Sequence, residues 1–445
     1  MVEIINIIAL VALVLGTLIT LSGYKVVNSP IVEGEKIKVF PLTRFLTFSV
    51  MTSVIFLGPF SMLKYLWWIL VLAFLCLTRF RFKVNGIIIT YCAFILWAVI
   101  SAIFVAPYKG PAINMVIKYT LPLAYLYLAY NAINDSEDLV FFLKRSTLAT
   151  FVYLFLVGGA TEKLARPVYD FFSLDTGLIL NYGPFADFIS SIFVMPLALY
   201  VITGKWRWLI ISGLCALSTL LANVRTGLGG IFLSTVFILL GTFKHKSMPW
   251  IAGVVVASVM ILFSVPELRQ KMFVDQDLTI SEYEIENTNF TTINSNNREY
   301  MWNRNLQKFY VPSPVIGSGL GIAVESMKRD NAQKPIEERG LELLHSDYVQ
   351  FLCDLGIIGL ALFIIFGVTT IIQIIRISWH RNNPFVLRLC GGMALGCTAA
   401  IFFSMSFDNI ITYCQQSYVF PFIFIGILMR VKELVVAGKW DSEDE

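Results

Sequence analysis

The segment that decides the organisation of this chain runs from residue 295 to residue 360. It contains the runs SNNREYMW (295–302), PSPVIGSGLG (312–321), LHSDY (344–348) and LGIIGL (355–360). These runs bring arginine, histidine and acidic residues together in a chain that elsewhere has the pattern of lipid-buried helices. The segment is therefore the first candidate for a polar functional site.

The composition around this segment is that of an integral membrane protein. Hydrophobic residues make up 57% of the 445 residues, charged residues make up 14%, and the mean hydropathy is +0.73. Long apolar stretches separated by short basic loops predict an all-α polytopic membrane protein and not an outer-membrane barrel. The seven cysteines lie in or beside apolar stretches, which predicts small core residues and no metal site. Nucleic acid is not an expected partner, because basic residues in such a chain mainly set its orientation.

About 20 apolar residues are needed to cross a bilayer, so we expect about 12 or 13 spanning helices. Their approximate ranges are 4–24, 43–60, 63–79, 85–106, 111–131, 139–159, 185–203, 207–222, 227–243, 249–266, 357–376, 385–406 and 409–431. The two helices on either side of Gly58-Pro59 could instead form one re-entrant unit. The expected domains are helices over 1–266, a long loop over 267–356, helices over 357–434 and an acidic tail over 435–445.

Basic residues predict the orientation of these helices. Lys205, Lys244 and Arg376 follow different helices yet lie on one side of the predicted membrane, together with the other basic residues of the short loops. The positive-inside rule makes this side cytoplasmic. The loop over 267–356 then faces the periplasm of a bacterium, and the protein is expected in the inner membrane.

The long loop has helical patterns of its own. Asn296 followed by Glu299 has the spacing of a capping box and predicts a helix to about residue 310, with Arg298 and Trp302 on one face. A second helix is expected over roughly 341–354. It would carry His345 on its surface and continue through Gly356 into the next span.

His345 is the strongest candidate for acid–base chemistry. It is the only histidine expected on the outer side, because His245 and His380 lie in basic cytoplasmic loops. An imidazole can act as a general base near neutral pH. A structural hydrogen bond on a helix surface is the alternative role.

Three basic residues are candidates for binding an anion. Arg298 lies in the first turn of its predicted helix, Arg225 lies between two apolar helices, and Lys118 lies inside a predicted span. Each also has an ordinary explanation: a solvated loop arginine, an arginine reaching lipid phosphate, and a paired structural charge, respectively. Asp408 could simply form hydrogen bonds between helices. The glycines of residues 317–321 predict a tight loop, because no Lys-Ser/Thr follows them as in a nucleotide-binding loop.

Taken together, the motifs resemble the O-antigen polymerase and ligase superfamily of bacterial membrane proteins. The resemblance lies in NR and MW within 297–302, PVIGSGLG at 314–321, HSDYVQ at 345–350, LGIIGL at 355–360 and the turn NVRTG at 223–227. Val224 replaces the serine usual in that turn. The motifs cover the second half of the chain, and the first half matches only as a helix pattern.

The resemblance implies a GT-C-like glycosyltransferase that moves a glycan from undecaprenyl diphosphate, with inversion and with neither a metal nor another cofactor. It implies that Arg298 and His345 are catalytic and that Arg225 and Arg298 bind diphosphate, with Lys118 as a further contact. Trp302, Tyr348 and Asp408 are expected near the substrate. The physical chemistry is consistent, because fixed arginines can stabilise a leaving diphosphate and a histidine can deprotonate an acceptor hydroxyl.

The leading functional prediction is a polysaccharide polymerase that joins lipid-linked repeat units. The close alternative is a ligase that transfers the glycan to lipid A-core, in lipopolysaccharide synthesis, or to another acceptor. A transporter is a third alternative, but the sequence has no visible inverted repeat. Expected partners are a lipid-linked donor and acceptor, membrane lipids, a chain-length regulator and a flippase.

Overall fold

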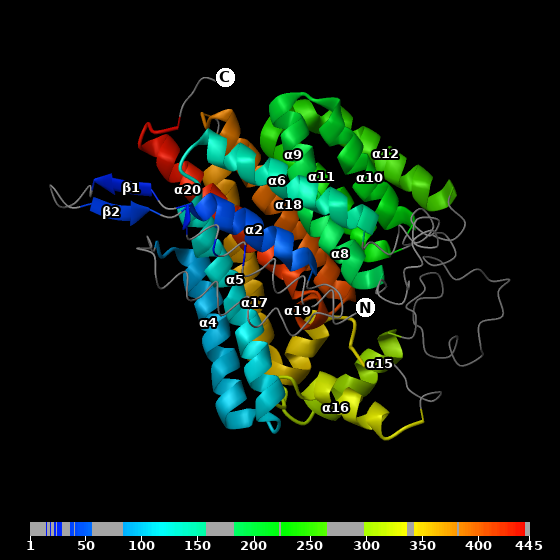
Figure 1. The fold of residues 1–445 in the computed structure, drawn as a ribbon. Coiled ribbons are helices and arrows are strands. Elements are labelled where there is room, and N and C mark those ends of the chain that lie inside the picture. Colours follow the sequence, from blue (N-terminus) through cyan, green and yellow to red (C-terminus); the bar gives the residue numbers. More distant parts are fainter. Residues whose placement is uncertain are drawn as a thin grey trace.

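The computed structural model describes residues 15, 18, 22–23, 25–28, 36–39, 41–55, 83–156, 182–221, 224–264, 298–335, 342–380 and 382–440. These residues form a bundle of α-helices (Figure 1), which confirms the predicted all-α polytopic membrane fold. Five of the described helices are long and apolar enough to cross a membrane. The described residues also contain an unexpected antiparallel strand pair, β1 (Lys25–Asn28) and β2 (Lys36–Val39).

The helices follow the predicted ranges closely, with two additional breaks. They are α2 (Leu42–Ile55), α4 (Gly86–Ile100), α5 (Lys109–Ala132), α6 (Ser136–Leu156), α8 (Tyr182–Ile192), α9 (Val194–Thr203), α10 (Trp206–Leu221), α11 (Arg225–Phe243), α12 (Met248–Ser264), α15 (Arg298–Asn305), α16 (Ile322–Ala332), α17 (Asp347–Ser378), α18 (Phe385–Phe407), α19 (Ile410–Tyr413) and α20 (Gln415–Val436). Short π-helical turns at Ser101–Val105 and Leu306–Tyr310 extend α4 and α15, and a 3-10 turn at Lys244–Ser247 joins α11 to α12. The expected span over 185–203 is divided at Phe193, and the last span is divided at Cys414. The expected helix at 63–79 and most of the first one lie outside the described residues.

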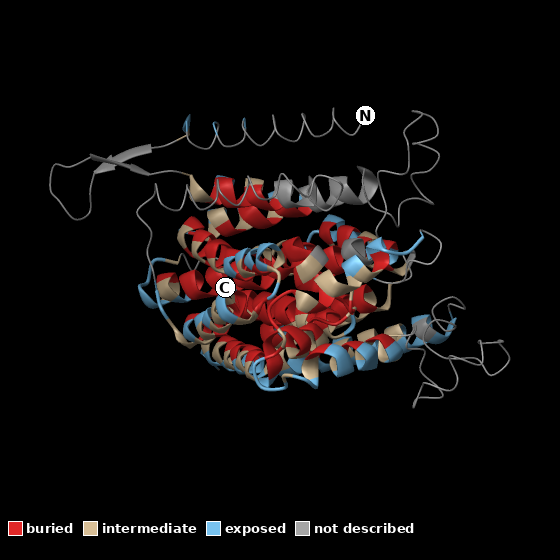
Figure 2. Ribbon diagram, turned by 90° about the horizontal axis from the view of Figure 1, so that it is seen from below, coloured by how far each residue is buried: buried red, intermediate tan, exposed pale blue. Residues whose placement is uncertain are grey.

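Aromatic side chains form the centre of the bundle, where buried residues concentrate (Figure 2). Phe94 of α4 contacts Tyr119 of α5 and Phe351 of α17, with ring centroids 5.1 and 5.4 Å apart. Phe363, three turns further along α17, lies 4.8 Å from Phe351. Tilted aromatic pairs of this kind each contribute about 0.5 to 1.5 kcal/mol beyond the area they bury. The cluster fixes α4, α5 and α17 relative to one another.

Small residues allow α11 and α18 to pack with their backbones close together. A Cβ atom on Gly241 would lie 2.7 Å from the Cα of Gly392, and one on Gly396 would lie 2.9 Å from the carbonyl oxygen of Ser234. Membrane helices usually associate through small residues that let them approach closely. Lipid tails are as apolar as the side chains, so close van der Waals packing and not the hydrophobic effect favours the association. This seam fixes the relative positions of Arg225, at the start of α11, and Asp408, directly after α18.

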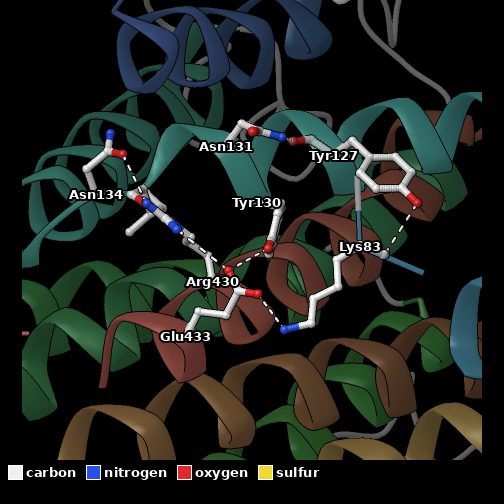
Figure 3. Close-up of polar contacts among 8 residues, drawn as sticks. Lys83, Tyr127, Tyr130, Asn131, Asn134, Arg430 and Glu433 are labelled. Carbon is white, nitrogen blue, oxygen red and sulfur yellow. Dashed lines mark hydrogen bonds and ion pairs between the residues drawn. The ribbon is translucent and has the colours of Figure 1, made fainter. Parts of the chain in front are cut away.

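One end of the bundle, which we call the basic end, is held by polar contacts (Figure 3). Glu433 of α20 accepts hydrogen bonds from Lys83, which precedes α4, and from Tyr130 of α5. Arg430 donates to the carbonyl oxygen of Ile133 over 2.9 Å. These contacts join the start of α4 to the ends of α5 and α20.

The basic end also has the composition of a membrane–water interface. Trp206 and Trp250 are strongly exposed; Trp206 directly follows Lys205, and Trp250 lies four residues after Lys246. Tryptophan prefers this depth in a bilayer because its ring is apolar and its N–H is polar. The opposite end, which we call the site end, contains α15, α16 and the first residues of α17 (Figure 1).

The glycine-rich run at residues 314–321 locks α17 into a kinked shape. Gly356 has the non-helical angles φ +67° and ψ −168° within α17, so the helix that was expected to continue through this residue is kinked there. The amide of Ile357 donates to the carbonyl of Pro314 over 2.9 Å, and the amide of Gly319 donates to the carbonyl of Asp354 over 3.0 Å. A Cβ on Gly317 would lie 2.5 Å from the backbone of Asp354. The run is thus a tight structural loop, as its glycines predict.

Candidate functional site

His345 lies immediately before α17 and not on a helix, so the expected helix over 341–354 begins later than predicted. Ser346 is the N-cap of α17, and its hydroxyl accepts a hydrogen bond from the amide of Val349 over 3.3 Å. A serine in this position satisfies a free amide of the first turn and therefore sets the start of the helix at Asp347. His345 consequently projects from the turn that leads into the helix.

The backbone of His345 is held in an unusual conformation. Its φ angle is +50°, which residues other than glycine rarely adopt, and holding the backbone at this angle costs about 1 to 3 kcal/mol. The indole N–H of Trp302, on α15, donates to the carbonyl oxygen of the buried Leu344 over 2.6 Å. The N-cap of α17 on one side and the hydrogen-bonded Leu344 on the other together hold His345 in this conformation. Observed strain of this kind is typical of functional sites.

The imidazole of His345 is paired with a carboxylate. Its Nδ1 atom lies 2.8 Å from Oδ1 of Asp408, the residue that follows α18. The Asp408 side chain is 7% exposed, whereas that of His345 is 23% exposed. A carboxylate at Nδ1 favours the tautomer with the proton on Nδ1, which leaves Nε2 as the basic atom. The pair therefore has the form of an oriented general base.

Asp408 belongs to a short turn that other elements hold in place. We call residues 408–412, between α18 and α20, the Asp408 turn. The ammonium group of Lys118, on α5, donates to the carbonyl oxygen of Thr412 over 2.6 Å, and the Lys118 side chain is buried. A carboxylate oxygen of Asp347 accepts from the amide of Ile411 over 3.3 Å. Lys118 thus contacts the turn that carries the partner of His345, while its contact with diphosphate stays a prediction.

The two arginines of the sequence prediction lie close to each other. Arg225 is the first residue of α11 and Arg298 is the first residue of α15, and the positive charge of Arg298 acts on the guanidinium group of Arg225. Arg225 is about half buried. Two guanidinium groups held together form a natural site for an anion with more than one negative charge, because their rigid donors match phosphate oxygens.

The arginines and the His345–Asp408 pair belong to one region. Trp302, which contacts the residue before His345, lies one helical turn after Arg298 on the same face of α15. On the other side, Thr226 follows Arg225 and neighbours Asp187 of α8, which interacts electrostatically with Asp408. The site end therefore brings basic groups and an oriented histidine to neighbouring positions.

Two other predicted site residues have structural partners. The hydroxyl of Tyr348 donates to the carbonyl oxygen of Phe402 over 3.0 Å, so it ties α17 to α18. Trp302 uses its indole N–H on Leu344, as described above. Their predicted contacts with substrate stay predictions, and the structure gives both residues a role in holding the site.

Several polar residues of the site were not singled out from the sequence. Asp187, Asp347, Gln350 and Asp354 are all buried at the site end. Buried polar side chains in a membrane protein are a general signal of function or of helix pairing. That signal marks these residues in the sequence, but only the packing of α8, α17 and α19 shows that Asp187, Asp347 and Gln350 lie near the Asp408 turn and that Asp354 binds Gln350. Among the described residues, no three His, Cys, Asp or Glu side chains are grouped as a metal site.

The fold and this region define a multi-pass α-helical membrane protein with a polar site at one end of its bundle. Residues 209–364, about a third of the chain, match the model of the O-antigen ligase family. The match contains Arg225, Arg298 and His345, and it confirms the resemblance to the O-antigen polymerase and ligase superfamily. It supports a function of that general type, in the processing of lipid-linked glycans. No curated protein matches the chain.

Proposed function

We propose that the protein is a polysaccharide polymerase that joins glycan repeat units linked to undecaprenyl diphosphate. The observation that carries this proposal is the hydrogen bond of 2.8 Å between His345 and Asp408, beside two neighbouring arginines. An oriented base and a polyanion site are what glycosyl transfer from a lipid diphosphate requires. The site faces the periplasm in this proposal, and the protein lies in a bacterial inner membrane.

The reaction forms one bond and breaks one bond. The acceptor hydroxyl attacks the anomeric carbon of the donor sugar from the face opposite the diphosphate, and its proton passes to Nε2 of His345. The bond between the anomeric carbon and the diphosphate oxygen breaks, with inversion at that carbon. The leaving diphosphate carries the negative charge, which Arg225 and Arg298 stabilise without a metal ion. Asp408 stabilises the imidazolium that forms.

A ligase is the second candidate, because the family whose model matches residues 209–364 is described as O-antigen ligase. The chemistry at His345 is the same for both functions. They differ in the acceptor, which is a second lipid-linked repeat unit for the polymerase and lipid A-core for the ligase. Only the product distinguishes them.

Reconstitution of the purified protein with lipid-linked repeat units tests the proposal. A ladder of longer lipid-linked glycans supports the polymerase, transfer only to added lipid A-core supports the ligase, and neither product refutes both. His345→Ala and Arg298→Ala should each lower turnover by at least about 100-fold, because each removes a transition-state interaction.

Matched controls are present in the same chain. His380→Ala changes a histidine near the basic end, and Arg304→Ala changes an exposed arginine on the same helix as Arg298. Both control variants should keep wild-type turnover. Near-normal turnover of His345→Ala would show that the general base is another group.

A further inference from the structure

The Asp408 turn must be placed accurately for Asp408 to meet His345. Asp408 has extended backbone angles, φ −150° and ψ 160°, and it separates the long helix α18 from the single turn of α19. A residue between two helices lacks the regular backbone hydrogen bonds of a helix, so these bonds do not fix the position of its side chain. The contacts of the Asp408 turn with its neighbours must therefore supply this precision.

Gln350 makes the central contact with this turn. Its side-chain oxygen accepts a hydrogen bond from the side-chain nitrogen Nδ2 of Asn409, over 2.9 Å, and a second one from the hydroxyl of Thr412, over 3.1 Å. Gln350 is 1% exposed. One amide oxygen has two lone pairs, so these two bonds use its full accepting capacity. Both bonded residues belong to the Asp408 turn: Asn409 directly follows Asp408, and Thr412 is the last residue of the turn.

The other end of the Gln350 amide is anchored as well. Its nitrogen donates to Oδ2 of Asp354 over 3.1 Å, and this fully buried carboxylate also accepts from the amides of Gly321, over 2.9 Å, and Ala323, over 3.1 Å. A carboxylate that already accepts two amide N–H groups offers only acceptors, so the amide of Gln350 must present its nitrogen to Asp354. The orientation that places its oxygen toward Asn409 follows. The side chains of Gln350 and Asp354 together thus join the start of α16, α17 and the Asp408 turn.

We propose that Gln350 is a positioning residue that holds the Asp408 turn on α17, so that Asp408 meets Nδ1 of His345. Its effect on turnover rests on the proposed function, whereas its effect on the imidazole does not. Lys118 and Asp347 also contact the turn, so loss of Gln350 loosens the turn without releasing it. Because a displacement of about 1 Å in a catalytic group can cost up to about 100-fold in rate, we expect turnover to fall by about 10- to 100-fold.

The imidazole of His345 provides a readout that does not depend on activity. Replacing His245 and His380 with glutamine leaves His345 as the only histidine, whose ¹⁵N-labelled ring can be observed by NMR in lipid nanodiscs. At a pH where the ring is neutral, the proton should reside on Nδ1, with a downfield Nδ1–H signal from its bond to Asp408. Gln350→Leu should weaken this signal and populate the Nε2–H tautomer. Asp408→Asn in the same background provides the spectrum of a broken pair.

Gln373→Leu is the matched control, because it makes the same substitution further along the same helix, toward the basic end. It should leave the spectrum of His345 unchanged. A second variant, Thr412→Val, removes one of the hydrogen bonds to Gln350 with almost no change in shape. It should shift the tautomers in the same direction as Gln350→Leu, but less.

The outcomes separate this proposal from the proposed function. A wild-type imidazole spectrum in Gln350→Leu, or in Thr412→Val if the first variant does not fold, would overturn the role of Gln350. So would a Gln373→Leu spectrum changed as much as that of Gln350→Leu. If the tautomers shift as expected but the wild-type protein transfers no glycan, the positioning role stands and the proposed function fails.

Discussion

Replacing Gly356 with alanine breaks the lock between α17 and the glycine-rich run. Its φ of +67° and ψ of −168° belong to a region that essentially only glycine occupies, at a cost of about 1 to 3 kcal/mol for other residues. The new Cβ would lie 2.5 Å from the amide nitrogen of Gly317, whereas ordinary contacts begin at 3.4 Å. The two segments must then separate, which weakens bonds such as that from Ile357 to Pro314, each worth about 1 kcal/mol. The expected loss is about 3 kcal/mol.

Thermal unfolding of the purified protein in detergent, followed by size-exclusion chromatography, measures this loss. The unfolding entropy grows with chain length, so a protein of 445 residues shifts its Tm by roughly 1 °C per kcal/mol, and Gly356→Ala should lower the Tm by about 3 °C. The control is Gly213→Ala in α10, where a Cβ would meet nothing within 4 Å. Alanine is the better helix former by about 1 kcal/mol, so this control should keep or slightly raise the Tm.

Equal melting temperatures for the wild-type protein and Gly356→Ala would refute the lock. If Gly356→Ala cannot be purified, Trp97→Phe probes the same junction more gently. The indole N–H of Trp97 donates to the carbonyl of Leu355 over 3.0 Å, and its loss should cost about 1 kcal/mol, or roughly 1 °C. An unchanged Tm in that variant would count against the junction in the same way.

Three further substitutions separate chemistry from support. Asp408→Asn should lower turnover by at least about 100-fold at an unchanged Tm, because the imidazole loses its orienting carboxylate; equal turnover would show that the pair is only structural. Trp302→Phe should lower turnover by about tenfold, because the hydrogen bond to Leu344 is lost. The amount of glycan product measures this, and a wild-type amount would show that the bond does not hold His345 in place. Glu433→Gln should lower the Tm by about 1 °C without changing turnover, since it weakens only the basic end; a large loss of turnover would refute this separation.

The sequence was sufficient for features that depend on local pattern. Apolar length predicted the helices, and the glycines at 317–321 predicted the tight loop. These signals are local because a glycine with positive φ or a long apolar run has the same meaning wherever the chain folds around it.

Other features depend on packing and could not be predicted. In a membrane helix nearly every face is apolar, so periodicity does not reveal which polar groups will meet. The pairing of His345 with Asp408, across 63 residues of sequence, therefore appears only in the structure. The start of α17 was misplaced for a different reason: the helical pattern continued through His345, but the N-cap at Ser346 decides where the helix begins.

The positive charges of Arg225 and Arg298 act on each other, so the arrangement of the first turns of α11 and α15 depends on what lies between the two guanidinium groups. Two cations alone push these helices apart, whereas a diphosphate between them attracts both. A ligand that binds only the folded arrangement adds to its stability in proportion to the logarithm of its concentration. The donor lipid would then act as a structural member of the protein, present for one turnover and replaced by the next molecule.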